Sequence, residues 1–377
     1  MLAVNFDVYA TAGRALLAGE PLYTTHPPDH PNYFYLYPPI VAVVFVPYAL
    51  LGGGPVAFAV HTAVQAIAAL GLAALTVRFV GRRGVDVGWL DRVLVAGFLL
   101  VGIHSVYSVY YGNVNVFLAA LIGVGFVAIE RDRQGWAGAA FGLAALIKAF
   151  PAALGIWFLR RRAWRAVGAA VAVGAGGLLV GLALGPETTV AYVTDALLPR
   201  FGSSAVNGEV SSPYAPYVTA RKPFLALGAD RTVAAVGAVA VVAPVVAYCY
   251  RDCSTPVARL RAAFATVAGV LLVFPSYFVY VVLVAFPLVG LAYLETGRAR
   301  WLVLAGAMVA NFSYALGSVR AAVQSAPLPP GVESTVLSAA GALLSVASLP
   351  GYGIAIVLAG CVLGTRANLV AESTTGG

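Results

Sequence analysis

Long apolar runs, separated by short connections rich in arginine, are the feature of this sequence that most limits its fold. The chain is 61% hydrophobic and 10% charged, whereas soluble globular proteins carry about 25% charged residues. One water-soluble core cannot bury so much apolar sequence. The sequence therefore predicts an all-α polytopic protein whose helices cross a membrane several times.

The apolar runs predict about eleven membrane segments, several of them shorter than the ~20 residues of a full span. We expect the short ones to tilt or to form half-helices. A further apolar stretch, 38–51, contains Pro47 and is interpreted as a re-entrant or interfacial element. The segments are 55–80, 92–110, 113–129, 136–147, 149–159, 164–185, 232–250, 262–275, 278–294, 301–318 and 335–364.

The positions of the basic residues predict the orientation of these segments. If 1–54 lies outside and each segment crosses once, sixteen of the 23 lysines and arginines fall inside and six outside. Because cytoplasmic loops carry an excess of Lys and Arg, 1–54 is predicted to be extracytoplasmic, as is the longest polar connection, 186–231. We expect one integral membrane domain over 1–364 and a disordered cytoplasmic tail over 365–377.

Composition also argues against several classes of function. The net charge of +8 lies in short loops, so topology explains it better than nucleic-acid binding does. The sequence has no GxxxxGK[ST] motif and its cytoplasmic loops are short, which argues against ATP-driven chemistry. The three cysteines and four histidines are scattered, which argues against a structural zinc site.

The first polar stretch is predicted to form a short amphipathic helix on the extracytoplasmic side. It favours helix from about residue 7, and Gly19 and Pro21 end it. Asp7, Thr11 and Arg14 are spaced to share one face. Asp7 is then either a helix cap or a functional carboxylate at the outer surface.

Three further stretches bring polar groups to predicted outer turns. In 143–162, Pro151 should break the helix and leave Lys148 at the tip of a helical hairpin. A lysine at this depth either marks a functional site, here a cation for a phosphate, or snorkels to the interface. The stretches 107–117 and 271–288 carry asparagines and tyrosines. These side chains either contact a ligand or lie at the membrane–water interface: Tyr111, Asn113, Asn115, Tyr277 and Tyr280.

Four of these stretches follow one another in a recognisable order. They are FDVYATAGRALLAGEPLY, FYLYPPIVAVVFVPYALL, YGNVNVF and GLAALIKAFPAALGIWFLRRRAWRA. Together they resemble the polytopic glycosyltransferases of family 87, the DUF2029 group, best over residues 5–170. The resemblance implies a GT-C fold with catalysis on the outer face and a polyprenyl-phosphate sugar donor. Because the group includes mycobacterial mannosyltransferases, it also implies a mannose-like hexose.

The resemblance assigns the catalytic base by position. The family pattern is D-x-x-V-Y, and here Asn5 stands four residues before Tyr9, while the carboxylate, Asp7, stands two before it. We expect Asp7 to be the base, since a carboxylate is needed for that role. Members normally have a transmembrane helix ahead of this loop, so we expect the start of the sequence to be truncated or misassigned.

Three other family motifs match to different degrees. K-x-x-P is present as Lys148 and Pro151, and G-Q-x-N appears as GNVN over 112–115. The late S-W-x-H-type motif appears as SYFVY over 276–280, without a histidine. A role carried by that histidine is therefore expected to be lost or met by another group.

These observations support one hypothesis for the function, a transfer of the sugar to a lipid or glycan acceptor. Asp7 accepts the proton of an acceptor hydroxyl as it attacks the anomeric carbon, with inversion. The leaving phosphate needs cations. We expect no cofactor, because a lipid-linked donor carries its own activation, and the resemblance implies no metal. The expected phosphate ligands are Lys148, Arg200 and Arg221, and the expected sugar or acceptor contacts are Asn5, Tyr9, Arg14, Tyr37, Tyr111, Asn113, Asn115, Tyr277 and Tyr280.

Two alternatives stay open at this point. A transporter or flippase for a lipid-linked sugar would use the same outer cavity, Lys148 and tyrosines without chemistry. Such proteins usually show internal repeats and polar groups on both sides, whereas this sequence has no clear repeat and few polar residues other than arginine near its cytoplasmic ends. A catalytically inactive homologue is the second alternative, suggested by Asn5 and the missing histidine.

Overall fold

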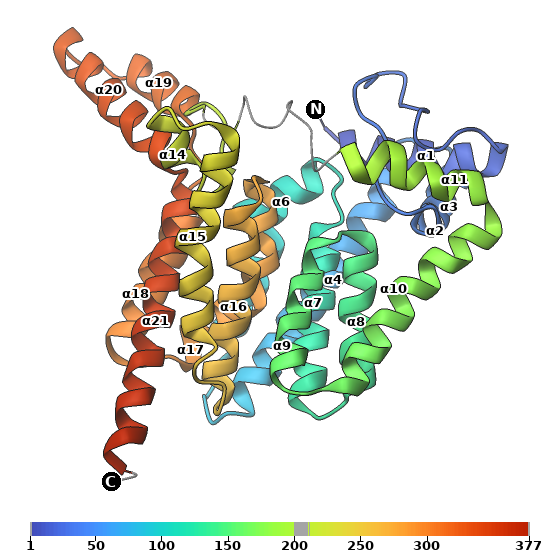
Figure 1. The fold of residues 1–377 in the computed structure, drawn as a ribbon. Coiled ribbons are helices and arrows are strands. Elements are labelled where there is room, and N and C mark those ends of the chain that lie inside the picture. Colours follow the sequence, from blue (N-terminus) through green and yellow to red (C-terminus); the bar gives the residue numbers. More distant parts are fainter. Residues whose placement is uncertain (1, 200–209, 211, 376–377) are drawn as a thin grey trace. The chain divides into compact units, whose positions relative to one another are not determined.

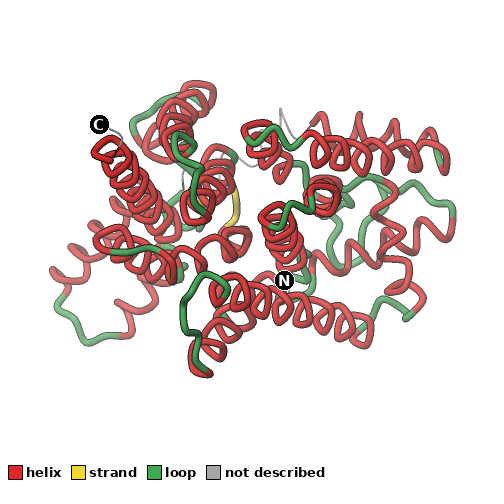
Figure 2. Tube along the Cα trace, turned by 90° about the horizontal axis from the view of Figure 1, so that it is seen from below, coloured by secondary structure: helices red, strands yellow, loops and turns green. Residues whose placement is uncertain are grey.

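The computed structural model describes residues 2–199, 210 and 212–375. The chain forms two compact units, 1–203 and 204–377. Helices make up most of both units, and the strands in the described part are the short pair β1 (Tyr217–Val218) and β2 (Ser276–Tyr277) (Figures 1 and 2). The all-α class is therefore confirmed, while a single domain over 1–364 stays a prediction.

The first unit, blue to green in Figure 1, starts with short helices and continues with long apolar ones. Its elements are α1 (Val4–Ala18), α2 (Pro39–Ala42), η1 (Val43–Phe45), α3 (Val46–Leu50), α4 (Pro55–Gly81), α5 (Trp89–Val101), α6 (Ile103–Tyr110), α7 (Asn115–Glu130), α8 (Gln134–Ile147), η2 (Phe150–Leu154), α9 (Gly155–Arg160), α10 (Trp164–Leu184), α11 (Pro186–Ala191) and η3 (Tyr192–Leu197).

The hairpin predicted around Lys148 is confirmed. Helix α8 stops at Ile147, and Lys148 has an extended backbone (φ −137°, ψ 124°), because Pro151 cannot continue the helix. The chain then returns through η2 and α9, since the rings of Phe141 in α8 and Phe158 in α9 lie 5.2 Å apart. Lys148 therefore lies at the turn.

Arginines from separate connections meet at one end of the first unit. Glu130, the last residue of α7, accepts hydrogen bonds from Arg83 (3.4 Å) and from Arg161 (3.1 Å). These ion pairs join the ends of α4, α7 and α9. The loops that the charge distribution assigned to one side of the membrane therefore gather at one end of the unit.

The second unit, yellow to red in Figure 1, contains helices and the antiparallel strand pair, in which Tyr217 is opposite Tyr277. Its helices are α14 (Lys222–Ala226), α15 (Arg231–Cys249), α16 (Pro256–Val273), η4 (Phe278–Val284), α17 (Ala285–Leu294), α18 (Gly297–Ala310), α19 (Leu316–Ser325), α20 (Pro330–Val346) and α21 (Leu349–Thr375).

Three sequence-based boundaries in the second unit are wrong. The predicted segment 301–318 is too long, because α18 ends at Ala310. The predicted segment 335–364 is two helices, α20 and α21, separated at Ala347, whose backbone is extended (φ −155°, ψ 156°). The next helix, α21, begins at Leu349, and Pro350 is its second residue. The tail predicted to be disordered from residue 365 continues α21 as far as Thr375, because Ala, Leu and Glu favour helix there.

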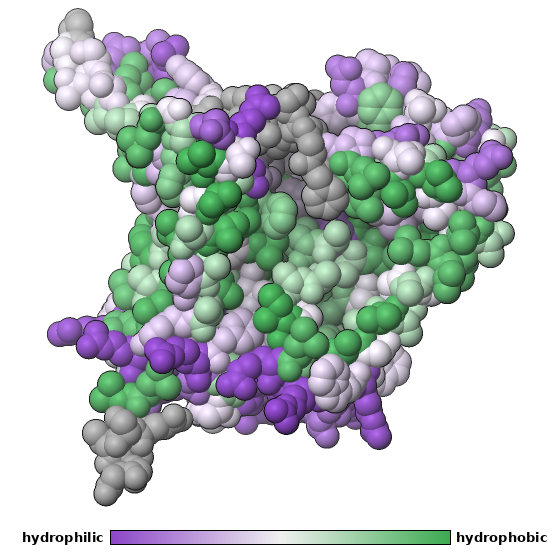
Figure 3. Space-filling view, viewed as in Figure 1, coloured by the Kyte–Doolittle hydropathy of each residue, from purple (hydrophilic) through white to green (hydrophobic). Residues whose placement is uncertain are grey.

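Six helices in the described part of the chain are long and apolar enough to cross a membrane, so the protein is a multi-pass membrane protein. In each unit apolar side chains cover the helices at mid-length and hydrophilic ones gather toward the ends (Figure 3). The count of about eleven crossings stays a prediction. The stretch 38–51 forms α2, η1 and α3, and its re-entrant or interfacial placement also stays a prediction. The spans are Pro55–Gly81, Trp89–Tyr110, Trp164–Ala183, Arg231–Cys249, Pro256–Val273 and Leu349–Val370.

Candidate functional site

Lys148 is the centre of a buried polar cluster in the first unit. Its Nζ donates to Oδ1 of Asn113 (3.0 Å) and of Asn115 (2.7 Å), and all three side chains are buried. The ring of Tyr37 lies 6.0 Å from the same nitrogen. Amide oxygens hold the ammonium group without neutralising it, so the cluster can bind an anion such as a phosphate.

Buried aromatic contacts hold Tyr37 beside this cluster. The hydroxyl groups of Tyr37 and Tyr9 lie 2.9 Å apart, and the Tyr9 ring stacks on Phe45 with centroids 4.4 Å apart. The Tyr23 hydroxyl donates to the backbone carbonyl of Tyr37 (2.8 Å). Helix α1 and the loop that follows it are thereby fixed against each other near Lys148.

Asp7 forms the second part of the candidate site. Its Oδ2 lies 3.6 Å from Nε2 of His30, and the two side chains are 34% and 23% exposed. Burial raises the pKa of the Asp7 carboxyl, while the charge of His30 opposes this rise. The cap position of α1 belongs to Ala3, so Asp7 does not cap the helix. It is an accessible carboxylate with enhanced basicity.

The two parts of the site face different sides of α1. Two residues turn a helix by roughly 200°, so Asp7 and Tyr9 point in nearly opposite directions. Asn5, one turn before Tyr9, shares its face. Arg14 shares the Asp7 face as predicted, and its guanidinium donates to Oγ1 of Thr11 (2.9 Å).

Gly112 lets α1 approach the turn before α7. The backbone N–H of Asn5 donates to the backbone carbonyl of Tyr111 (2.8 Å), which fixes the helix start on this turn. Gly112 has φ 68°, and a Cβ there would lie 2.4 Å from Cβ of Phe6. Both the backbone conformation and the space require glycine.

The variant Gly112→Ala is expected to lower the free energy of unfolding by about 2–4 kcal/mol, through left-handed strain and overpacking. Chemical unfolding in detergent, followed by circular dichroism, measures this. Gly84→Ala is the matched control, because Gly84 has φ 85° and open space around its Cα. An equal loss in both variants would mean that the contact with Phe6 contributes nothing.

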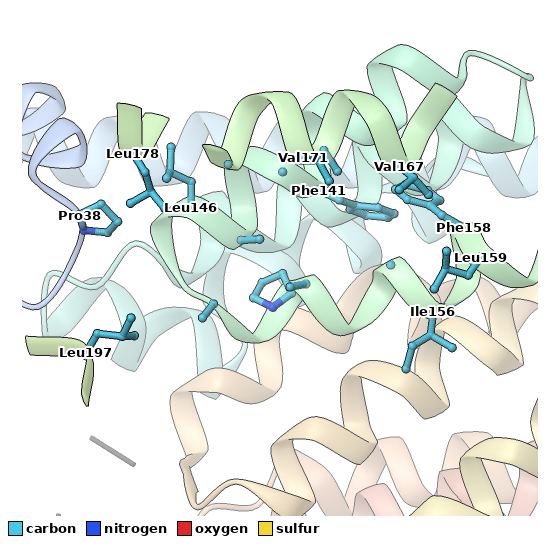
Figure 4. A pocket seen from close by; sticks show the side chains of 18 of the residues that line it. Pro38, Phe141, Leu146, Ile156, Phe158, Leu159, Val167, Val171, Leu178 and Leu197 are labelled. Atoms are coloured by element: carbon cyan, nitrogen blue, oxygen red, sulfur yellow. The ribbon is translucent and has the colours of Figure 1, made fainter. Parts of the chain in front are cut away.

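An apolar pocket of about 560 Å³ lies in the first unit, and residues that follow Lys148 in the chain line it. It is formed by α8, η2, α9 and α10 with Pro38 and parts of η3, and both Ala149 and Pro151 line it. Figure 4 shows that its labelled side chains are apolar, among them Pro38, Phe141, Leu146, Val171 and Leu197. Ile156 is 54% exposed, so the pocket reaches the surface of the first unit. A hydrocarbon chain fits these walls.

The side chains of the remaining predicted residues make other contacts or belong to the second unit. Tyr111 packs against the ring of Tyr110 with centroids 5.3 Å apart. Tyr277 in β2, the half-buried Tyr280 in η4 and Arg221 belong to the second unit, and Arg221 Nε donates to a backbone carbonyl at 2.9 Å. Arg200 lies outside the described residues.

The sequence reasoning missed several polar residues. His61 and Gln65 lie buried in α4, where Gln65 Oε1 accepts from the amide of Phe117 (3.1 Å). Their presence one turn apart inside an apolar run was the signal that could have identified them. His30 had no such signal, because only the fold brings it to Asp7.

Lys222 has a structural role in the second unit. It is 1% exposed, and its Nζ donates to the carbonyls of Ser212 (3.1 Å), Ala215 (3.2 Å) and Leu344 (3.2 Å). These bonds attach the connection before α14 to α20. Within the described residues, no group of three or more His, Cys, Asp or Glu could hold a metal ion.

Comparison with known proteins identifies the family. The chain belongs to glycosyltransferase family 87, whose model matches residues 35–275. This confirms the resemblance carried by the four sequence stretches. The matched range includes the Lys148 cluster, and Asp7 lies ahead of it.

Two relatives illustrate the similarity. The polyprenol-phosphate-mannose-dependent alpha-(1-2)-phosphatidylinositol pentamannoside mannosyltransferase of Mycolicibacterium smegmatis is 36% identical over 178 residues, which are 45% of this chain and 40% of that protein. The alpha-(1-2)-phosphatidylinositol mannoside mannosyltransferase of Mycobacterium tuberculosis, which is also polyprenol-phosphate-mannose-dependent, is 32% identical over 220 residues, 54% of this chain and 51% of that one. The chain therefore spans about half the length of these relatives.

One solved structure is also similar over most of the chain. ArnT from Cupriavidus metallidurans, bound to undecaprenyl phosphate, matches with a TM-score of 0.47 and 16% sequence identity. The match covers 97% of this chain and 74% of that one.

Proposed function

We propose that this chain transfers a sugar from a polyprenyl-phosphate donor to a lipid or glycan acceptor on the extracytoplasmic face of the membrane. The observation that carries the proposal is the buried Lys148 ammonium in a turn whose next residues, Ala149 and Pro151, line an apolar pocket. A phosphate suits the cation and a hydrocarbon tail suits the pocket, and a lipid-linked sugar phosphate has both parts. The names of the relatives favour mannose as the sugar.

The orientation of the proposed site rests on charge. Lys148 and Asn115 lie at the start of α7, and the arginines around Glu130 lie at its other end. Because basic residues favour the cytoplasmic side, the Lys148 end is assigned to the outside.

In the proposed reaction Asp7 acts as the general base. Its carboxylate takes the proton of an acceptor hydroxyl while that oxygen bonds to the anomeric carbon, and the bond from this carbon to the phosphate oxygen breaks. The phosphate leaves with its charge stabilised by Lys148. An inverting displacement needs the base and the leaving group on opposite sides of the sugar.

The variant Lys148→Met is expected to lower kcat/KM for the lipid-linked donor by about 100-fold, because the phosphate loses its buried cation. Initial rates with radiolabelled polyprenyl-phosphate mannose in detergent–lipid micelles measure this. The matched control is Arg160→Met, an exposed cation at the other end of the unit, whose rate should equal that of the wild type. A wild-type rate for Lys148→Met would contradict the proposed phosphate site.

The variant His30→Gln is expected to move the acidic limb of the pH–rate profile to higher pH. The charge of His30 lowers the pKa of Asp7, so its removal raises that pKa. Asp7 must be ionised to act as a base, and activity is lost as pH falls through its pKa, so the loss begins earlier. An unchanged limb in a profile of kcat/KM against pH would show that this carboxylate does not limit the rate.

A further inference from the structure

We propose that the first unit binds the headgroup of an anionic phospholipid in a pocket between α4 and α5. This pocket has a volume of about 690 Å³ and lies where α4 ends and α5 begins. It is at the arginine-rich end of the unit, away from Lys148. The site is therefore separate from the proposed donor site and does not depend on catalysis.

The lining of this pocket changes character along its length. Arginines line one part and apolar side chains line the other, as they would around the phosphate and the acyl chains of a lipid. The basic part consists of Arg78, Arg82 and Arg92, and the apolar part includes Leu70, Ala74, Val77 and Ala96. Asp86 is the acidic residue in the lining, so the net charge of the lining residues is positive.

Arginines of the next connection add to this charge. Arg131 is exposed; slight desolvation and then the charges of Arg82, Arg133 and Arg78 lower the pKa of its guanidinium. Like charges therefore crowd this end of the unit. Glu130 already accepts hydrogen bonds from Arg83 and Arg161, so it does not neutralise the other arginines. A bound anion would reduce the repulsion among these arginines.

The surroundings favour a lipid over a free anion. Trp89, the first residue of α5, is 75% exposed, and Leu90 and Leu94 are more than half exposed beside it. Exposed tryptophan at a helix end is typical of the membrane–water interface. The arginines therefore lie at headgroup depth, and by the positive-inside rule this is the cytoplasmic leaflet, which carries anionic lipids.

The test is a titration of the purified full chain with dioctanoyl phosphatidylglycerol, with bound lipid counted by native mass spectrometry. We expect the dissociation constant to rise about 10-fold or more in the variant R82Q/R92Q, through loss of two headgroup cations. The charge-matched control R298Q/R300Q, on exposed arginines of α18, should bind as the wild type does. Ala96→Phe should also weaken binding, because it fills the apolar part and leaves every charge in place.

Two further arms identify the ligand. Dioctanoyl phosphatidylcholine should bind at least ~10-fold more weakly than phosphatidylglycerol, and inorganic phosphate should not displace the lipid at equal concentration. Equal binding by R82Q/R92Q, by Ala96→Phe and by the wild type would overturn the proposal. Displacement by inorganic phosphate would also overturn it, since the site would then be one for a free anion. If R82Q/R92Q fails to fold, Ala96→Phe decides the question.

Discussion

Replacing Asp7 by asparagine is expected to lower kcat for sugar transfer by about 100-fold or more, because asparagine cannot accept the proton of the acceptor hydroxyl. The KM for the donor should change little, since the proposed site holds the phosphate through Lys148 and not through Asp7. Initial rates with radiolabelled polyprenyl-phosphate mannose, measured over a range of donor concentrations, separate the two constants.

Two variants sharpen this result. Asp29→Asn removes a neighbouring exposed carboxylate that also acts on the pKa of Asp7, and it should keep most of the activity. The double variant Asn5→Asp with Asp7→Asn moves the carboxylate to the position of the family pattern, on the face of Tyr9. Full activity in Asp7→Asn alone would contradict the assigned base. Activity regained only in the double variant would mean that the base can act from the Tyr9 face.

The second large effect concerns stability. Glu295→Gln is expected to lower the free energy of unfolding by about 3–5 kcal/mol, because it leaves a buried arginine without its counter-charge. Arg261 and Glu295 are 5% and 3% exposed and form a two-point ion pair, with Nη2 to Oε2 at 3.0 Å. Gly364 of α21 packs on the guanidinium, where a Cβ would lie 2.7 Å from Cζ. Chemical unfolding in detergent measures the change.

The exposed Glu20→Gln is the control for loss of a carboxylate, and it should change stability by less than about 0.5 kcal/mol. The double variant Arg261→Met with Glu295→Leu should be more stable than Glu295→Gln, because it removes both buried charges together. If the double variant were as unstable as the single one, packing and not the unpaired charge would explain the loss.

Features that depend on a single residue or on a run of similar residues could be predicted from the sequence. Pro151 located the break that leaves Lys148 at a turn, and the apolar runs located most of the helices. The clustering of arginines at one end of the first unit followed from their distribution among short loops. These features depend on neighbours in the chain, so they can be inferred without knowing the fold.

Features that depend on distant pairs could not be predicted in this way. Arg261 and Glu295 are separated by 34 positions, and nothing in either stretch indicates that they meet. The same holds for the contact of His30 with Asp7. The direct bonds from Lys148 to both asparagines were also not predicted, although each of these residues was singled out by its own motif.

The measurement that tests the central claim most directly follows radiolabelled mannose in proteoliposomes that contain the wild-type protein, polyprenyl-phosphate mannose and a crude lipid and glycan acceptor extract. The proposed function predicts that the label leaves the polyprenyl phosphate and appears on an acceptor, with inverted anomeric configuration. A label that stays on the polyprenyl phosphate, whether or not the lipid crosses the bilayer, would contradict it. Crossing without transfer would instead establish a flippase.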